Sequence, residues 1–88
     1  MRMPNLDARG LNLLDRVGDA LGCGPRQTLS SRSREIVAAS SGSYRVECGP
    51  TDVQVRMARI LLEPGPQWQW WDRLRRAAAC LENKHASE

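Results

Sequence analysis

The stretch TDVQVRMARILL, residues 51–62, decides the fold, because it fixes one helix and gives that helix apolar side chains on two sides. Gly49 and Pro50 precede it and break any regular element before it. Thr51 and Gln54 stand at capping-box spacing, in which the threonine hydroxyl accepts from the third amide and the glutamine reaches back. The sequence therefore predicts a helix that begins directly after Thr51.

The apolar residues of this helix form two stripes, which lie on opposite sides of it. The main stripe contains Val53, Met57, Ile60 and Leu61, and the second contains Val55, Ala58 and Leu62. A narrow polar strip lies between them, made of Asp52, Arg56, Arg59 and Glu63. A helix that is apolar on two sides needs cover on two sides. We therefore expect it either to be the central element of the domain or to present one side to a partner.

Upstream, residues 6–21 predict an amphipathic helix, since apolar and charged residues separate onto two halves of the helical wheel. Asn5 is the expected N-cap, and Gly22 is expected to end the helix. Gly10 and Gly18 lie on the apolar side, where a missing side chain lets another element approach closely. We interpret both glycines as packing notches.

Between these two helices the pattern favours a β-hairpin. Residues 34–39 and 44–48 flank the turn-forming sequence 40–43, and the second arm alternates cleanly between apolar and polar residues. The core-facing side of this hairpin is expected to carry Val37, Ala39, Tyr44, Val46 and Cys48. A polar loop is expected over 25–33. The alternative interpretation makes residues 31–40 a helix.

Downstream, Pro64-Gly65-Pro66 breaks the chain, and a third helix is expected over residues 67–84. Its apolar stripe consists of Trp70, Trp71, Leu74, Ala77, Ala78 and Leu81. We expect residues 1–4 and 85–88 to fray. The sequence thus predicts one α+β domain over residues 1–88, with a helix, a β-hairpin and two further helices. If residues 31–40 are helical, the alternative is an all-α helical bundle.

Composition excludes several classes of protein. The chain has 88 residues, of which 41% are hydrophobic, and it contains no apolar run long enough to cross a membrane. Its start is charged, so export is not expected. Three scattered cysteines without a CxxC motif fit a reducing cytosol, so a cytoplasmic location is expected. His85 is the only histidine and lies near a frayed end, so we expect no enzyme activity, no metal site and no cofactor.

The candidate binding residues are one tryptophan, several arginines and the second apolar stripe. Trp68 projects away from the apolar stripe of its helix, and exposed tryptophans beside arginines are typical binding hot spots. The expected partner-binding set is Trp68, Val55, Leu62, Arg56 and Arg59. A second set is a candidate for contact with anions or nucleic acid, and it contains Arg26, Arg32, Arg34, Arg73 and Arg76. The net charge is only +3, which is a weak electrostatic footprint for a dedicated nucleic-acid binder.

Three function classes follow from these features. The first is a small regulatory or protein-interaction module, an adaptor or inhibitor, whose partner is another protein or a second copy in a homodimer. The second is an accessory protein that binds DNA or RNA. The third is a structural assembly subunit, because the order helix, hairpin, helix over residues 6–63 resembles the small phage head–tail joining proteins of the W type. That resemblance concerns element order and assigns no residue a role.

Overall fold

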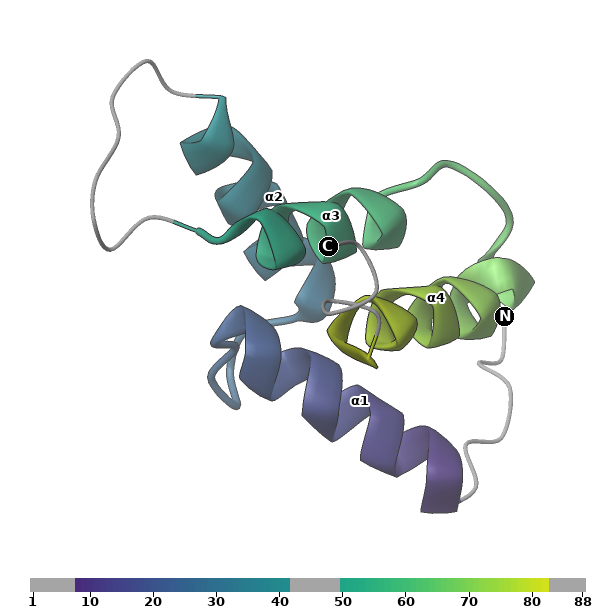
Figure 1. Ribbon diagram of the computed structural model, residues 1–88. Helices are drawn as coiled ribbons and strands as arrows, with labels where there is room; N and C mark the ends of the chain where they lie inside the picture. The colour runs from purple at the N-terminus through teal and green to yellow at the C-terminus, as the bar shows by residue number, and fades with distance from the viewer. Residues whose placement is uncertain (1–7, 42–49, 83–88) are drawn as a thin grey trace.

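The computed structural model describes residues 8–41 and 50–82, and this part of the chain forms four α-helices and one 3₁₀ turn. In chain order they are α1 (Ala8–Leu21), α2 (Leu29–Ser40), α3 (Asp52–Leu61), the 3₁₀ helix η1 (Gln67–Gln69) and α4 (Trp70–Glu82). Helix α3 lies between α2 and α4 and packs against both, while α1 packs mainly against α4 (Figure 1). The molecule measures 40 × 28 × 24 Å along its principal axes.

The predicted α+β fold is wrong, since the described residues contain no strand and form an all-α domain. Residues 34–39, expected as the first arm of the hairpin, lie within α2. The second arm, 44–48, lies outside the described residues. Helix α2 also begins at Leu29, inside the stretch 25–33 for which a polar loop was expected. The alternative all-α bundle is the architecture observed.

Helix α2 forms because a local cap and a helical burial pattern agree. The Thr28 hydroxyl accepts a hydrogen bond from the amide of Ser31 at 3.1 Å, which satisfies one of the free amides at the start of the helix. Ser33 and Ile36 are buried, and Leu29 is half-buried. These three positions are spaced four and three residues apart, so they share one face of a helix. The strand prediction failed because residues 34–39 were assigned from the alternation of residues 44–48, and a short apolar run such as Ile36-Val37 does not itself distinguish strand from helix.

Helix α1 is confirmed over the residues described. It ends at Gly22, whose φ of 72° is a left-handed conformation that favours glycine. The amide of Cys23 then donates to the carbonyl of Gly18 at 2.9 Å and closes the last turn. Gly10 is buried, but a Cβ built on Gly18 meets nothing within 4 Å, so no residue of the described ranges 8–41 and 50–82 uses the predicted packing notch at Gly18. The expected N-cap, Asn5, lies outside the described residues.

The capping box that opens α3 is confirmed. The amide of Gln54 donates to the Thr51 hydroxyl at 3.2 Å, and the amide of Thr51 donates to Gln54 Oε1 at 2.9 Å. The other end of the Gln54 side chain donates from Nε2 to the carbonyl of Ala20 at 2.8 Å. One glutamine therefore caps α3 and also holds its start against the end of α1.

The hydrophobic core lies where α3 and α4 meet α1 and α2. Its buried apolar residues are Val17, Leu21, Ile36, Met57, Ala58, Leu61, Leu74, Ala77, Ala78 and Cys80. Every helix contributes, and α3 and α4 together supply seven of these ten residues. The predicted central position of the 51–62 helix is thus observed, with α2 covering one side and α4 the other. Among the described helices, none is both long and apolar enough to span a bilayer.

Candidate interaction surface on helix α3

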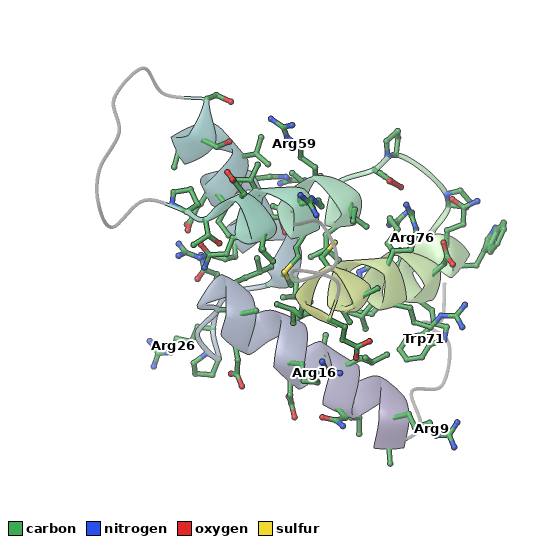
Figure 2. The ribbon with its side chains drawn as sticks, viewed as in Figure 1. Arg9, Arg16, Arg26, Arg59, Trp71 and Arg76 are labelled. Carbon is green, nitrogen blue, oxygen red and sulfur yellow. The ribbon has the colours of Figure 1, made fainter. Side chains whose placement is uncertain are left out.

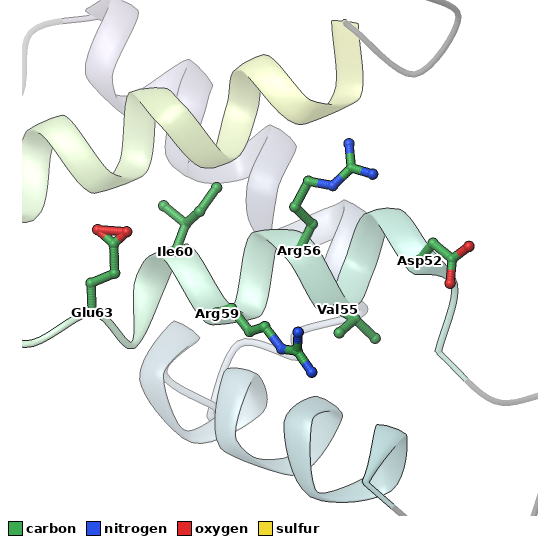
Figure 3. Close-up of a pocket in the computed structure, with 6 residues that line it drawn as sticks. All are labelled: Asp52, Val55, Arg56, Arg59, Ile60 and Glu63. Carbon is green, nitrogen blue, oxygen red and sulfur yellow. The ribbon is translucent and has the colours of Figure 1, made fainter. Parts of the chain in front are cut away.

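An open hollow of about 430 Å³ lies on the outer face of α3. It is lined by Asp52, Val55, Arg56, Arg59, Ile60 and Glu63. Figure 3 shows Ile60 and Arg56 leaning toward α4, and Val55 and Arg59 leaning toward α2. We call this surface, defined by these six residues, the α3 face.

The α3 face exists because α3 is wedged between two neighbours. Asp52, Arg56, Arg59 and Glu63 recur at three- and four-residue spacing, so they share the side of the helix opposite buried Leu61. The polar strip predicted from the sequence is thus the solvent-facing side. Met57 and Leu61 are buried, whereas Val53, Val55, Ile60 and Leu62 remain half-buried. Helices α2 and α4 therefore cover most of the two apolar stripes, and partial apolar exposure flanks the charged strip.

The two arginines of the α3 face have no carboxylate partner among the described residues. Arg56 and Arg59 are both exposed, and no ion pair or hydrogen bond involves either guanidinium. Glu63, at the far end of the face, is held by Arg76 of α4, whose Nη1 donates to Glu63 Oε2 at 2.9 Å. This contact lowers the pKa of Glu63 and raises that of Arg76. The charges of Arg56 and Arg59 are therefore available to an external anion, while Glu63 is already paired and the carboxylate of Asp52, unpaired within the described chain, lies at the other end of the face (Figure 3).

Of the arginines predicted to contact anions, only some are available. Arg26 and Arg34 are exposed, with no ion pair in the described part of the chain. Arg76 pairs with Glu63 and Asp72, and Arg32 donates to the carbonyl of Leu21 at 2.8 Å and pairs with Glu35. Arg73 is 7% exposed and lies inside the fold. Figure 2 shows Arg26 and Arg59 at separate parts of the surface. The structure therefore does not gather these arginines into one basic stripe.

Trp68 is 70% exposed on η1, so the structure places it as a surface side chain. It follows Glu63 by five residues, so the two Cα atoms are at most about 18 Å apart. Trp71 is half-buried, and the Arg75 guanidinium lies 6.0 Å from its ring centroid, at the limit of a cation–π contact. Leu62 is half-buried and does not line the hollow. The predicted partner-binding set is thus divided: Val55, Arg56 and Arg59 share one surface, Trp68 is exposed beyond its end, and Leu62 faces elsewhere.

A second open hollow, of about 410 Å³, lies between α1 and the segment that leads into α2. It is lined by Leu14, Asp15, Gly18, Asp19, Cys23, Gly24, Pro25, Gln27, Thr28 and Leu29. The sequence pattern does not single out this surface, because Asp15 and Asp19 fall on the polar half of the helical wheel of α1. The sequence does carry a signal there in Gly18, interpreted above as a packing notch, because a glycine costs about 1 kcal/mol in a helix interior. No neighbour within the described chain explains that glycine.

The titratable groups do not assemble a metal site within the part of the chain that the structure describes. No group of three or more His, Cys, Asp or Glu residues is placed to hold a metal ion there. Cys23 is half-buried and Cys80 is buried, and burial raises the pKa of the Cys23 thiol above its usual value. His85 and Cys48 lie outside the described residues.

Comparison of this chain with protein-family models, with curated proteins and with solved structures finds no match.

Proposed function

We propose that this protein is a small, non-enzymatic protein-interaction module, an adaptor or inhibitor, that binds through the α3 face. Its partner presents carboxylates next to exposed apolar side chains. The observation that carries the proposal is the pair of unpartnered arginines, Arg56 and Arg59, beside half-buried Val55 and Ile60 in one open hollow. Guanidinium groups bind carboxylates by bidentate hydrogen bonds, and the flanking apolar groups gain from the removal of water.

Trp68 extends the proposed contact beyond the end of α3. Large aromatic side chains and arginines dominate the binding energy of protein interfaces. A tryptophan that is 70% exposed gains more apolar burial from a partner than any half-buried residue of the α3 face. Free thiols at Cys23 and Cys80 support a reducing compartment, so the proposal includes a cytoplasmic location.

A nucleic-acid partner is less well supported. Binding to duplex DNA needs several cations that follow the phosphate backbone. Arg73 is buried, and Arg32 and Arg76 are paired with carboxylates. The remaining arginines do not form a stripe. The third class, a phage-type structural subunit, was suggested by a helix, hairpin, helix order, and residues 34–39 do not form the first strand of that hairpin.

The test compares three fluorescently labelled probes by anisotropy at near-physiological salt. The first probe is an acidic amphipathic peptide with leucine on one face and glutamate on the other. The second is the same peptide with lysine in place of each glutamate, and the third is a short DNA duplex. We expect the acidic peptide to bind best. We expect the variant R56E/R59E to weaken that binding at least about tenfold, because two charge-assisted hydrogen-bonding groups become repulsive.

The matched control is R9E/R75E, which changes the net charge by the same amount at two exposed arginines that do not line the hollow of the α3 face. We expect it to retain peptide binding. An equal loss in both variants would mean that net charge, and not the α3 face, governs the interaction. Tighter binding to the DNA duplex than to the acidic peptide would favour the nucleic-acid class.

A further inference from the structure

The second hollow carries negative charge that the fold leaves unpaired. Asp15 and Asp19 lie one turn apart on the outer side of α1, and both are exposed. Neither takes part in an ion pair within the described chain. By contrast, the carboxylates of Glu35, Glu63, Asp72 and Glu82 each pair with an arginine, and Asp52, at the start of α3, is the one other carboxylate of the described residues without an ion pair. Two neighbouring unpaired carboxylates beside an open hollow suit a partner that carries two cations.

Apolar surface lies directly beside these carboxylates. Leu11 is 53% exposed, and Leu14 and Gly18 follow it at three- and four-residue spacing along the same side of α1. Nothing lies within 4 Å of a Cβ built on Gly18, so an external side chain can approach the helix backbone there. We call this surface, formed by Leu11, Leu14, Asp15, Gly18 and Asp19, the α1 face.

The α1 face and the α3 face are complementary in charge and in spacing. Asp15 and Asp19 are about 6 Å apart along the axis of α1, and Arg56 and Arg59 are about 4.5 Å apart along the axis of α3. Long, flexible arginine side chains span that difference. Each face also places apolar groups beside its charges, Leu11 and Leu14 on one and Val55 and Ile60 on the other.

We infer that the α1 face of one copy of this chain docks on the α3 face of a second copy. This inference rests on the proposed function, and it names a second copy as the partner that presents carboxylates beside apolar groups. The contact joins two different faces and forms once between each pair of copies, so it is heterologous. Each copy then keeps one free α1 face or one free α3 face, and association continues into a chain or closes into a ring.

The test measures self-association by sedimentation velocity over a range of protein concentrations at low salt. We expect the weight-average sedimentation coefficient of the wild-type protein to rise with concentration beyond the value of a dimer. Raising the salt concentration should reduce it, since exposed charge pairs are screened. The variants D15R/D19R and R56E/R59E should each weaken association at least about tenfold, because each makes both faces carry the same charge.

The decisive variant combines all four substitutions, D15R/D19R/R56E/R59E. It exchanges the charges of the two faces and keeps the wild-type net charge, so it restores the complementarity that each double variant lacks. We expect its association to return to near the wild-type value. Circular dichroism of each variant checks that the helices are retained.

Two results would overturn the inference: a wild-type protein that stays monomeric up to about millimolar concentration at low salt, or a fourfold variant that associates no better than the double variants. If the fourfold variant is monomeric and R56E/R59E loses binding of the acidic peptide, the inferred self-contact is wrong and the proposed function is retained. If the fourfold variant associates again but the wild-type protein binds no acidic peptide, the self-contact is retained and the proposed binding of other proteins is wrong.

Discussion

At the scale of single residues, Arg73 is the least expected feature of the fold. It lies in α4, it is only 7% exposed, and its Nε and Nη1 have no hydrogen-bond partner within the described chain. Its Nη1 lies 3.2 Å from a Cβ built on Gly65, so the side chain extends under the turn between α3 and η1. The hydration lost at these two nitrogens opposes folding, because no hydrogen bond replaces it, although the charge of Arg73 is close enough to Glu63 to help lower the pKa of that carboxyl.

We therefore predict that Arg73→Met raises the free energy of unfolding by about 1–2 kcal/mol, because an apolar side chain of similar length removes the desolvation cost and keeps the packing. Urea unfolding followed by circular dichroism measures this change. Arg75→Met is the matched control, since Arg75 is exposed on the same helix, and its effect should stay within about 0.5 kcal/mol. A loss of stability in Arg73→Met would mean that a carboxylate pairs with Arg73 in solution.

At the scale of the helices, the two glycines near the end of α1 have opposite effects on the stability of the folded state. Gly22 has a φ of 72°, which side-chain-bearing residues rarely adopt, whereas Gly18 lies inside the helix with open space around its Cα. We predict that Gly22→Ala lowers the free energy of unfolding by about 1–2 kcal/mol. Gly18→Ala should raise it by about 0.5–1 kcal/mol.

Thermal unfolding of the two glycine variants, compared under the same conditions, measures both effects. Both substitutions add one methyl group, at positions four residues apart. The difference between their effects on stability therefore reports the backbone conformation at each position. Destabilisation by Gly18→Ala would show that this position is closely packed in solution, in conflict with an open α1 face.

At the scale of the whole molecule, the sequence predicted the helix at the centre of the fold correctly and the fold class incorrectly. The capping box of Thr51 and Gln54 and the two apolar stripes of residues 51–62 correctly indicated a central helix, because a local hydrogen-bonding pattern and helical periodicity are both encoded within a few residues. Residues 34–39 were assigned to a strand because short apolar runs fit either structure, and the packing of α2 on α3 decides between them.

The candidate site was predictable in part for the same reason. Arg56 and Arg59 belong to a strip whose exposure follows from helical spacing alone. The burial of Arg73 and the pairing of Arg76 with Glu63 depend on how α4 packs on α3, and helix periodicity does not determine that packing. The acidic α1 face was missed because unpaired charge becomes visible only once the partners of the other carboxylates are known.

The ion pairs between helices also give the whole molecule a pH dependence. Glu63 joins the end of α3 to α4 through Arg76, and this hydrogen bond lowers the pKa of Glu63 below its usual value of 4.5. A carboxylate whose pKa is lower in the folded state contributes its full stabilisation above the pKa of the unfolded chain. That contribution is lost as the pH falls through the lower pKa of the folded state. The same sign holds for Glu35, whose pKa is lowered by hydrogen bonds from Arg32 and Gln27.

We therefore predict that the melting temperature falls as the pH is lowered from about 5 to about 3, and that Glu63→Gln makes this fall smaller, because the amide does not titrate. Calorimetry of both proteins across this range measures the difference in slope. Asp15→Asn is the control, since it removes an exposed carboxylate without an ion-pair partner in the described chain, and it should keep the wild-type slope. Equal slopes in the wild type and Glu63→Gln would mean that the Glu63–Arg76 contact is not formed in solution, and the link between α3 and α4 at this end would then depend on apolar packing alone.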